Sequence, residues 1–408
     1  MKDGKVHVRT MTRIDLEQGP LDWRSKQSSK WTYRLGNCTI ELQKQPVIFT
    51  ALLIGLCVLA YFKLSGGLKS DFDHDFNHIP SHSKPFYNST YPLSHPTITP
   101  LGLKYRIAVI ADLDTDSKVK NKDNQWESFL KLGDLTWDDK SEAVTIDWDP
   151  EPLELKSTLS TGGRGMELSE LAVFNGHLYT VDDRTGVVYR IDRDKKGKYK
   201  VIPWVILPDG NGLETKGFKC EWMTVKDQHL YVGGLGKEWT TQDGTVLNFN
   251  PMFVKRISME GQVEHLDWYD HYLALRSRAG IEFPGYMIHE AAMWSNIYQK
   301  WTFLPRRASK KKYNDVEDEN HGTNLMLEAN ANFDHIDLKT VGDLSKPSHG
   351  FSSLKFLPDT KDSVIVALKS EELQGKVATY IMVFRRDGTI LYPETYIGDH
   401  KYEGIEFI

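Results

Sequence analysis

The feature that most constrains the fold of this chain is a short strand motif that occurs five times. Each copy begins with Glu or Ser and continues as a short apolar strand. The five lead residues are Ser169, Glu221, Glu290, Ser352 and Glu403. The first four copies are each followed by a turn and a second apolar strand, at 177–181, 229–233, 300–304 and 363–367. The fifth copy, 403–408, lacks this second strand, but a matching strand lies far earlier, at 106–110.

The spacing of the lead residues indicates a repeated unit. Successive lead residues are 52, 69, 62 and 51 positions apart, which is the size of a propeller blade of about four strands. The sequence therefore predicts an all-β fold, a five-bladed β-propeller over residues 101–408. Pairing of 403–408 with 106–110 would close the ring and leave no exposed sheet edge. The alternative is a chance recurrence of short strands in an ordinary β-rich chain.

A membrane anchor is predicted ahead of this domain. Residues 46–62 are seventeen consecutive uncharged residues, at the short end of what crosses a bilayer; a buried core helix is the alternative. Lys and Arg are more frequent in 25–44 than in 63–82, which places the N-terminus in the cytosol by the positive-inside rule. We therefore expect a disordered cytosolic tail at 1–45, a transmembrane signal-anchor at 46–63 and a lumenal stem at 64–100.

This topology sets expectations for modification and partners. The acceptor motif at Asn88 would be lumenal and glycosylated, whereas the motif at Asn37 would be cytosolic and unmodified. Cys220 would be the one lumenal cysteine, either an inert buried thiol or an intermolecular one. Cleavage in the stem would release a secreted form, and the sequence is compatible with a homodimer. A net charge of −5 argues against a nucleic-acid partner.

Charged residues gather where the repeated strands begin. In an antiparallel pair the start of the first strand lies beside the end of the second, so both should lie on one rim of the ring. Three of the five lead residues are Glu, and buried carboxylates repel each other unless a cation neutralises them. Oxygen ligands without His or Cys favour a hard ion, Ca²⁺ above Mg²⁺. Arg and Lys around such an ion would suit a polyanion such as a phosphate chain.

Each of these features also has a plain structural explanation. A Glu at a strand start is often solvated, and mixed charges are common on any surface. Asp112-Leu-Asp114 and Asp182–Gly186 are turn patterns. The runs Lys310–Lys312 and Glu317–Glu319 are expected in a solvated loop, and Glu372 in an outer loop.

Several long motifs resemble the soluble calcium-activated nucleotidase, or apyrase, family. They lie at 106–115, 163–169, 181–189, 231–240, 303–309, 349–353 and 401–408, and the resemblance covers nearly all of 84–408. It implies a five-bladed propeller with a central Ca²⁺. It also implies hydrolysis of nucleoside diphosphates and, to a lesser extent, triphosphates. UDP and GDP are the substrates favoured by membrane-bound members in the endoplasmic reticulum and Golgi apparatus.

The resemblance also implies site residues. The metal ligands of the family correspond to Ser169, Glu170, Glu221, Glu290, Ser352 and Glu403. Glu170 departs from the Asp expected at its position, so its ligation could differ, for example through the backbone carbonyl. The expected catalytic residues are Asp112, Asp114, Asp183, Arg164 and Arg306.

A mechanism follows as a hypothesis. Ca²⁺ would bind the phosphate chain, Arg164 and Arg306 would hold non-bridging oxygens, and Asp112 or Asp114 would orient the attacking water. The competing interpretation is a non-enzymatic, calcium-stabilised lumenal binding module. A Ca²⁺-dependent hydrolase of other esters or lactones is a third, which the clustered Arg and Lys favour less.

Overall fold

The computed structural model describes residues 30–35, 38–43 and 86–408. The chain divides into two units, Met1–Pro85 and Phe86–Ile408. In the first, β1 (Lys30–Leu35) pairs antiparallel with β2 (Cys38–Gln43). The expectation of disorder throughout 1–45 was therefore wrong for this hairpin, whose strands alternate apolar and polar residues.

The predicted transmembrane segment, 46–63, lies outside the described residues. Within the described ranges, the structure contains no helix with the length and apolar character needed to cross a bilayer.

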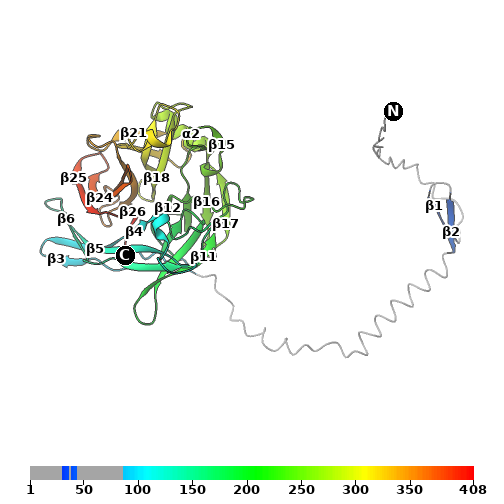
Figure 1. Cartoon of the computed structure of the whole chain (residues 1–408), viewed down its shortest axis with the longest axis horizontal. Coiled ribbons are helices and arrows are strands. Elements are labelled where there is room, and N and C mark those ends of the chain that lie inside the picture. Colours follow the sequence, from blue (N-terminus) through cyan, green and yellow to red (C-terminus); the bar gives the residue numbers. More distant parts are fainter. Residues whose placement is uncertain (1–29, 36–37, 44–85) are drawn as a thin grey trace. The chain divides into compact units, whose positions relative to one another are not determined.

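The second unit contains five sheets of four or more strands around a common centre (Figure 1). The first sheet consists of β8 (Leu168–Phe174), β9 (His177–Asp182), β10 (Val187–Arg193) and β11 (Tyr199–Ile206). The second consists of β12 (Trp222–Lys226), β13 (His229–Gly233), β16 (Phe253–Ile257) and β17 (Val263–Asp267). The third consists of β18 (Tyr286–Ser295), β19 (Lys300–Ser309), β20 (Leu325–Asn330) and β21 (Ile336–Thr340). The fourth consists of β22 (His349–Phe356), β23 (Val364–Leu373), β24 (Lys376–Arg385) and β25 (Ile390–Gly398).

The fifth sheet joins the two ends of the propeller. Its main strands are β26 (Lys401–Phe407), β4 (Gly102–Asp112), β5 (Trp126–Asp138) and β6 (Ala143–Trp148). Two short strands complete it, β3 (Thr97–Thr99) beside β4 and β7 (Leu153–Ser157) beside β5. Ile405 lies opposite Val109 and Phe407 opposite Ile107. The predicted five blades and the closure by terminal strands are therefore confirmed.

The innermost strand of each sheet lines the centre of the ring. Strands β8, β12, β18, β22 and β26 each contact the next around the ring, and β26 contacts β8. These strands are buried almost throughout, because they pack against one another as well as against their own sheets. Strands β8, β12, β18 and β22 each begin a β-hairpin. The turn after β8 has positive φ at Asn175 and Gly176, the conformation that favours Asn-Gly.

The hydrophobic core lies between neighbouring sheets. In one layer Ile107, Val109 and Ile405 of the closing sheet pack with Val366 and Leu368 of the fourth. Another layer, between the second and third sheets, contains Trp222, Trp268, Trp294, Trp301 and Phe303. Every sheet is thus packed on both faces, which explains how a ring without disulfides holds its shape.

The remaining elements are short insertions. They are η2 (Asp114–Ser117), β14 (Trp239–Thr240), β15 (Val246–Asn248), η3 (Asn250–Met252), α2 (Tyr269–Arg278) and α3 (Asp315–Asp318). Two of them bear on the site, because η2 follows β4 directly and α3 lies in the loop between β19 and β20.

Candidate active site at the channel mouth

The lead residues of the repeat lie at irregularities of the innermost strands. The register shifts at Glu290 in β18, at Ser352 in β22 and at Glu403 in β26, so none of the three has a partner in the ladder. A comparable shift leaves Ser169 unpaired in β8, and Glu221 immediately precedes β12. A β-bulge turns a side chain away from the ordinary alternation. These bulges therefore explain how the side chains of equivalent residues in different blades can point toward the same end of the ring.

A cavity of about 450 Å³ lies at this end of the innermost strands, and we call it the charged pocket. Seven of the predicted site residues line it, namely Asp112, Asp114, Asp183, Glu221, Glu290, Arg306 and Glu403. These residues lie in, or directly beside, strands of four of the five sheets. The structure thus brings together most of the site that the sequence predicted.

Arg306 of β19 lines the charged pocket and joins three of its carboxylates. Its Nη1 donates to Glu403 Oε1 at 2.6 Å and also to Glu290. Its Nη2 donates to Glu372 Oε2 at 2.8 Å. Burial alone would lower the pKa of Arg306, but the three surrounding carboxylates raise it well above its usual value. The guanidinium is therefore a permanent cation held between three sheets.

Lys401 provides a second cation beside the paired aspartates. Its Nζ lies 2.6 Å from Asp112 Oδ2 and 2.7 Å from Asp114 Oδ2. Arg164 does not line the charged pocket, but its Nη2 lies 3.6 Å from Asp114 Oδ1 and 2.6 Å from Glu167 Oε2. Asp112, Asp114 and Glu167 offer oxygens within 4.8 Å of one another, a spacing that could hold a metal ion. Sequence reasoning missed Glu167, although it lies inside the quoted motif 163–169.

The carboxylate of Glu221 is suited to a bound cation. Its Oε1 lies 2.9 Å from Lys219 Nζ but makes no hydrogen bond of normal geometry within the described part of the chain. Burial raises the pKa of Glu221, and it raises that of Glu403 well above the usual range. The ionised form of both carboxylates is therefore unfavourable unless a further cation, such as a metal ion, binds beside them. Carboxylate oxygens such as these are among the ligands that Ca²⁺ prefers.

Three predicted ligands lie outside the lining of the charged pocket. Ser169 remains close to it, because its hydroxyl donates to Glu403 Oε2 at 3.5 Å. The Ser352 hydroxyl donates to the carbonyl of Tyr402 at 3.3 Å. The Glu170 side chain is engaged elsewhere, accepting from the Ser353 hydroxyl at 2.9 Å and lying 3.2 Å from Lys355 Nζ. Burial raises the pKa of Glu170 to about 8.

Two expectations about loops were wrong. Glu372, expected in an outer loop, lies on β23 and lines the charged pocket. Burial would raise its pKa, but Arg306 and Lys401 lower it to about 2. The run 317–319 was expected to be solvated, yet Asp318 and Glu319 are half-buried and line the same pocket. The reason is that β19 and β23 continue well past the apolar segments that identified them.

The fold and the pocket define a five-bladed β-propeller with a densely charged pocket at one end of its innermost strands. A family model described as apyrase matches residues 113–408. The chain therefore belongs to the apyrase family, which confirms the resemblance found in its sequence.

Curated relatives agree with this assignment. The soluble calcium-activated nucleotidase 1 of Rattus norvegicus is 58% identical over 322 residues, covering 79% of this chain and 78% of the relative. The apyrase of Cimex lectularius is 41% identical over 378 residues, covering 92% of this chain and 99% of the relative. Apyrase apy-1 of Caenorhabditis elegans is 49% identical over 308 residues, covering 74% and 84%.

Proposed function

We propose that this chain is a calcium-dependent nucleotidase that releases phosphate from nucleoside diphosphates, UDP and GDP first, and less readily from triphosphates. Its family and the name of its rat relative support hydrolysis of nucleotides and activation by calcium. The observation that carries the proposal is the charged pocket, where carboxylates and cations from several blades converge. A phosphate chain needs both kinds of group, cations for its oxygens and carboxylates for a metal ion and a water molecule.

Glu221, Glu290 and Glu403 would hold the calcium ion, with Ser169 and Ser352 close by. The unpartnered oxygen of Glu221 and the raised pKa of Glu403 support this assignment. A bound Ca²⁺ would supply positive charge that offsets the charge developing on the phosphate oxygens. The nearby group of Asp112, Asp114 and Glu167 is a second place in the charged pocket where a cation would be stabilised.

The residues of the chain itself would position the substrate and the water. Arg306 carries more hydrogen-bond donors than its contacts with three carboxylates use, so it can hold a non-bridging phosphate oxygen. Arg164, fixed by Glu167, would hold another. Asp112 or Asp114 would orient the attacking water. Asp183, the remaining predicted catalytic residue, forms an ion pair with Lys219 in the wall of the charged pocket.

The same proposal includes a cellular setting. The uncharged segment 46–62 and the charges that flank it support a single-pass type II membrane protein with the propeller in the lumen of the endoplasmic reticulum or Golgi apparatus. The exposed Asn88 lies at the start of the folded unit, where a glycosylating enzyme could reach it.

Phosphate release from UDP, GDP, ADP and ATP tests the activity directly. The chain is assayed with Ca²⁺, with Mg²⁺ and with a chelator, and an Arg306→Lys variant is compared in each condition. We expect turnover with Ca²⁺ alone, fastest with UDP and GDP. Arg306→Lys should be at least tenfold slower, because Lys cannot replace the bidentate fork of Arg. Calcium-dependent stabilisation without any turnover would instead favour a binding module.

A further inference from the structure

A second cavity lies at the opposite end of the innermost strands, and we call it the far cavity. Its volume is about 560 Å³. All five innermost strands contribute to it, with Val173 from β8, Thr224 from β12, Trp294 from β18, Lys355 from β22 and Glu406 from β26. No predicted catalytic or metal-binding residue lines it, although Asn88, the predicted glycosylation site, does. The far cavity is therefore separate from the charged pocket, although both are built on the same strands.

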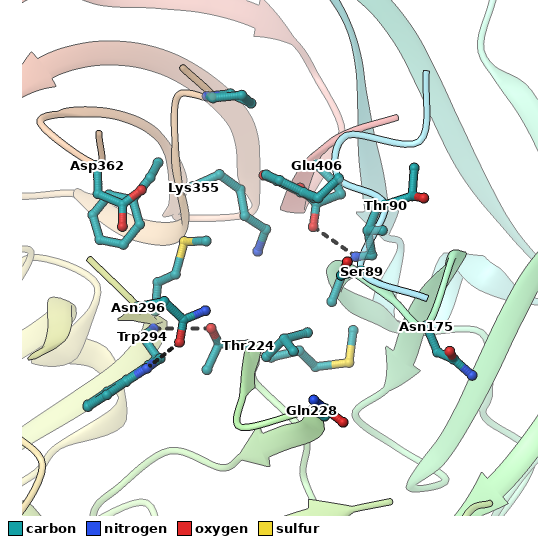
Figure 2. A pocket seen from close by; sticks show the side chains of 18 of the residues that line it. Ser89, Thr90, Asn175, Thr224, Gln228, Trp294, Asn296, Lys355, Asp362 and Glu406 are labelled. Atoms are coloured by element: carbon teal, nitrogen blue, oxygen red, sulfur yellow. Dashed lines mark hydrogen bonds between the residues drawn. The ribbon is translucent and has the colours of Figure 1, made fainter. Parts of the chain in front are cut away.

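Lys355 is a buried cation that points into the far cavity (Figure 2). The residue is 2% exposed. Its Nζ lies 3.2 Å from Glu170 Oε1, yet it makes no hydrogen bond of normal geometry within residues 86–408. An ammonium group has three donors, so the single ion pair with Glu170 leaves donors to spare, and a buried donor without an acceptor is costly enough to require an explanation.

Asn296 and Thr224 provide two further donors in the lining of the far cavity, because the side-chain oxygen of each already accepts a hydrogen bond. The indole nitrogen of Trp294 donates to Asn296 Oδ1 at 2.9 Å, and the backbone nitrogen of Trp294 donates to Thr224 Oγ1 at 3.1 Å. The Asn296 amide and the Thr224 hydroxyl keep their own hydrogens free to donate. Figure 2 shows Lys355, Asn296 and Thr224 gathered on one side of the cavity.

Acceptors and aromatic rings complete the wall. Asp227, Asp359, Asp362 and Glu406 line the far cavity, as do the rings of Tyr87, Tyr91 and Trp294. Glu406 accepts from the Tyr91 hydroxyl at 3.0 Å, and Asp362 from the Ser295 hydroxyl at 2.7 Å. Glu406 also accepts from the backbone nitrogens of Val173 and Phe407, and Asp359 from the Tyr105 hydroxyl. A carboxylate has about four lone-pair sites, so each of them keeps some capacity to accept. Fixed polar groups among aromatic walls are the usual composition of a small-molecule site.

The charges of the wall restrict the chemistry of the ligand. An anion would meet four carboxylates and a single ammonium that already neighbours Glu170. A cation would meet Lys355, and an apolar ligand would bury that ammonium without hydrogen bonds. Hydroxyl groups both donate and accept, so they satisfy the donors and the carboxylates together. We propose that the far cavity binds an uncharged, hydroxyl-rich ligand of the saccharide class.

Saturation-transfer NMR on the full chain tests this proposal. The probes are methyl β-D-glucopyranoside, methyl β-D-galactopyranoside and the methyl glycoside of N-acetylglucosamine. Acetate, inorganic phosphate and putrescine represent anions and a cation. We expect signals from at least one glycoside and none from the charged probes. The glycoside signal should fall at least fivefold in Lys355→Met and in Asn296→Asp.

The two variants guard against a folding artefact. Asn296→Asp keeps the oxygen that accepts from Trp294 and exchanges only the free donor for an acceptor, so it should keep its melting temperature. Exposed Lys195, on the β10–β11 turn, gives the matched control Lys195→Met, which should bind like the unchanged chain. The proposal is overturned if no glycoside binds, if charged probes bind instead, or if Asn296→Asp binds glycoside normally.

Discussion

Removing residues 403–408 should open the ring, because β26 is the strand through which the closing sheet completes the propeller. Ile405 and Phe407 are fully buried, and burial of each contributes about 1.5–3 kcal/mol. Residues 404–407 also pair with β4, and each net backbone hydrogen bond adds about 1 kcal/mol. The total is about 5–10 kcal/mol, most of the 5–15 kcal/mol by which a domain is stable.

Urea denaturation followed by tryptophan fluorescence measures this loss. The truncated chain should show no cooperative unfolding transition at 25 °C, or one with a much lower midpoint. Removing Ile408 alone is the control, since it is only half-buried and should cost about 1–2 kcal/mol. A chain ending at Tyr402 that unfolded at the midpoint of the intact chain would refute closure by β26.

Three further predictions address the seam, the charged pocket and the topology. Gly404→Ala should destabilise the fold by about 1–3 kcal/mol, because a Cβ there would lie 2.6 Å from the backbone of β8. Gly398→Ala, with 3.4 Å of room, should unfold like the unchanged chain. Glu372→Gln should lower stability at pH 7 by about 1 kcal/mol after solvent screening. Because folding lowers the pKa of Glu372 to about 2, this difference should shrink as pH falls from 4.5 to 2; a gap constant with pH would contradict the ion pair. A glycosidase-sensitive mass shift should disappear in Asn88→Gln and persist in Asn37→Gln, and the reverse result would invert the predicted orientation.

The sequence revealed the blades because each one contains a compact apolar strand pair. Ile405 and Phe407 belong to a short apolar strand that follows a lead Glu, as in the earlier copies, so the partner of the last strand could be inferred. The lead residues were recognised as equivalent because each is a Glu or Ser that begins a short apolar strand, and their spacing supported this. Their position in β-bulges could not be predicted, because a bulge depends on how two strands pair and has no signature in the sequence of either strand alone.

Glu372 and Glu170 show where sequence reasoning fails. The apolar part of β23 ends at Leu368, and the strand continues to Leu373 through polar and charged residues. Such residues usually indicate a loop. Here the charge of Glu372 is neutralised within the charged pocket by Arg306 and Lys401. Glu170 lies next to a lead residue, yet its carboxylate faces Lys355 instead. Which side chain a bulge turns toward the pocket is decided by neighbouring blades, which are distant in the sequence.

The most direct test of the central claim is a calcium titration of phosphate release across carboxylate variants. Glu221→Gln, Glu290→Gln and Glu403→Gln each remove one charge from a different blade while keeping size and polarity. If one Ca²⁺ binds all three, each variant should need at least tenfold more Ca²⁺ for half-maximal activity. Each should also lose part of the thermal stabilisation that Ca²⁺ gives. Glu151→Gln, in an exposed turn, should leave both quantities unchanged. Three variants that titrate like Glu151→Gln would contradict a shared calcium site in the charged pocket.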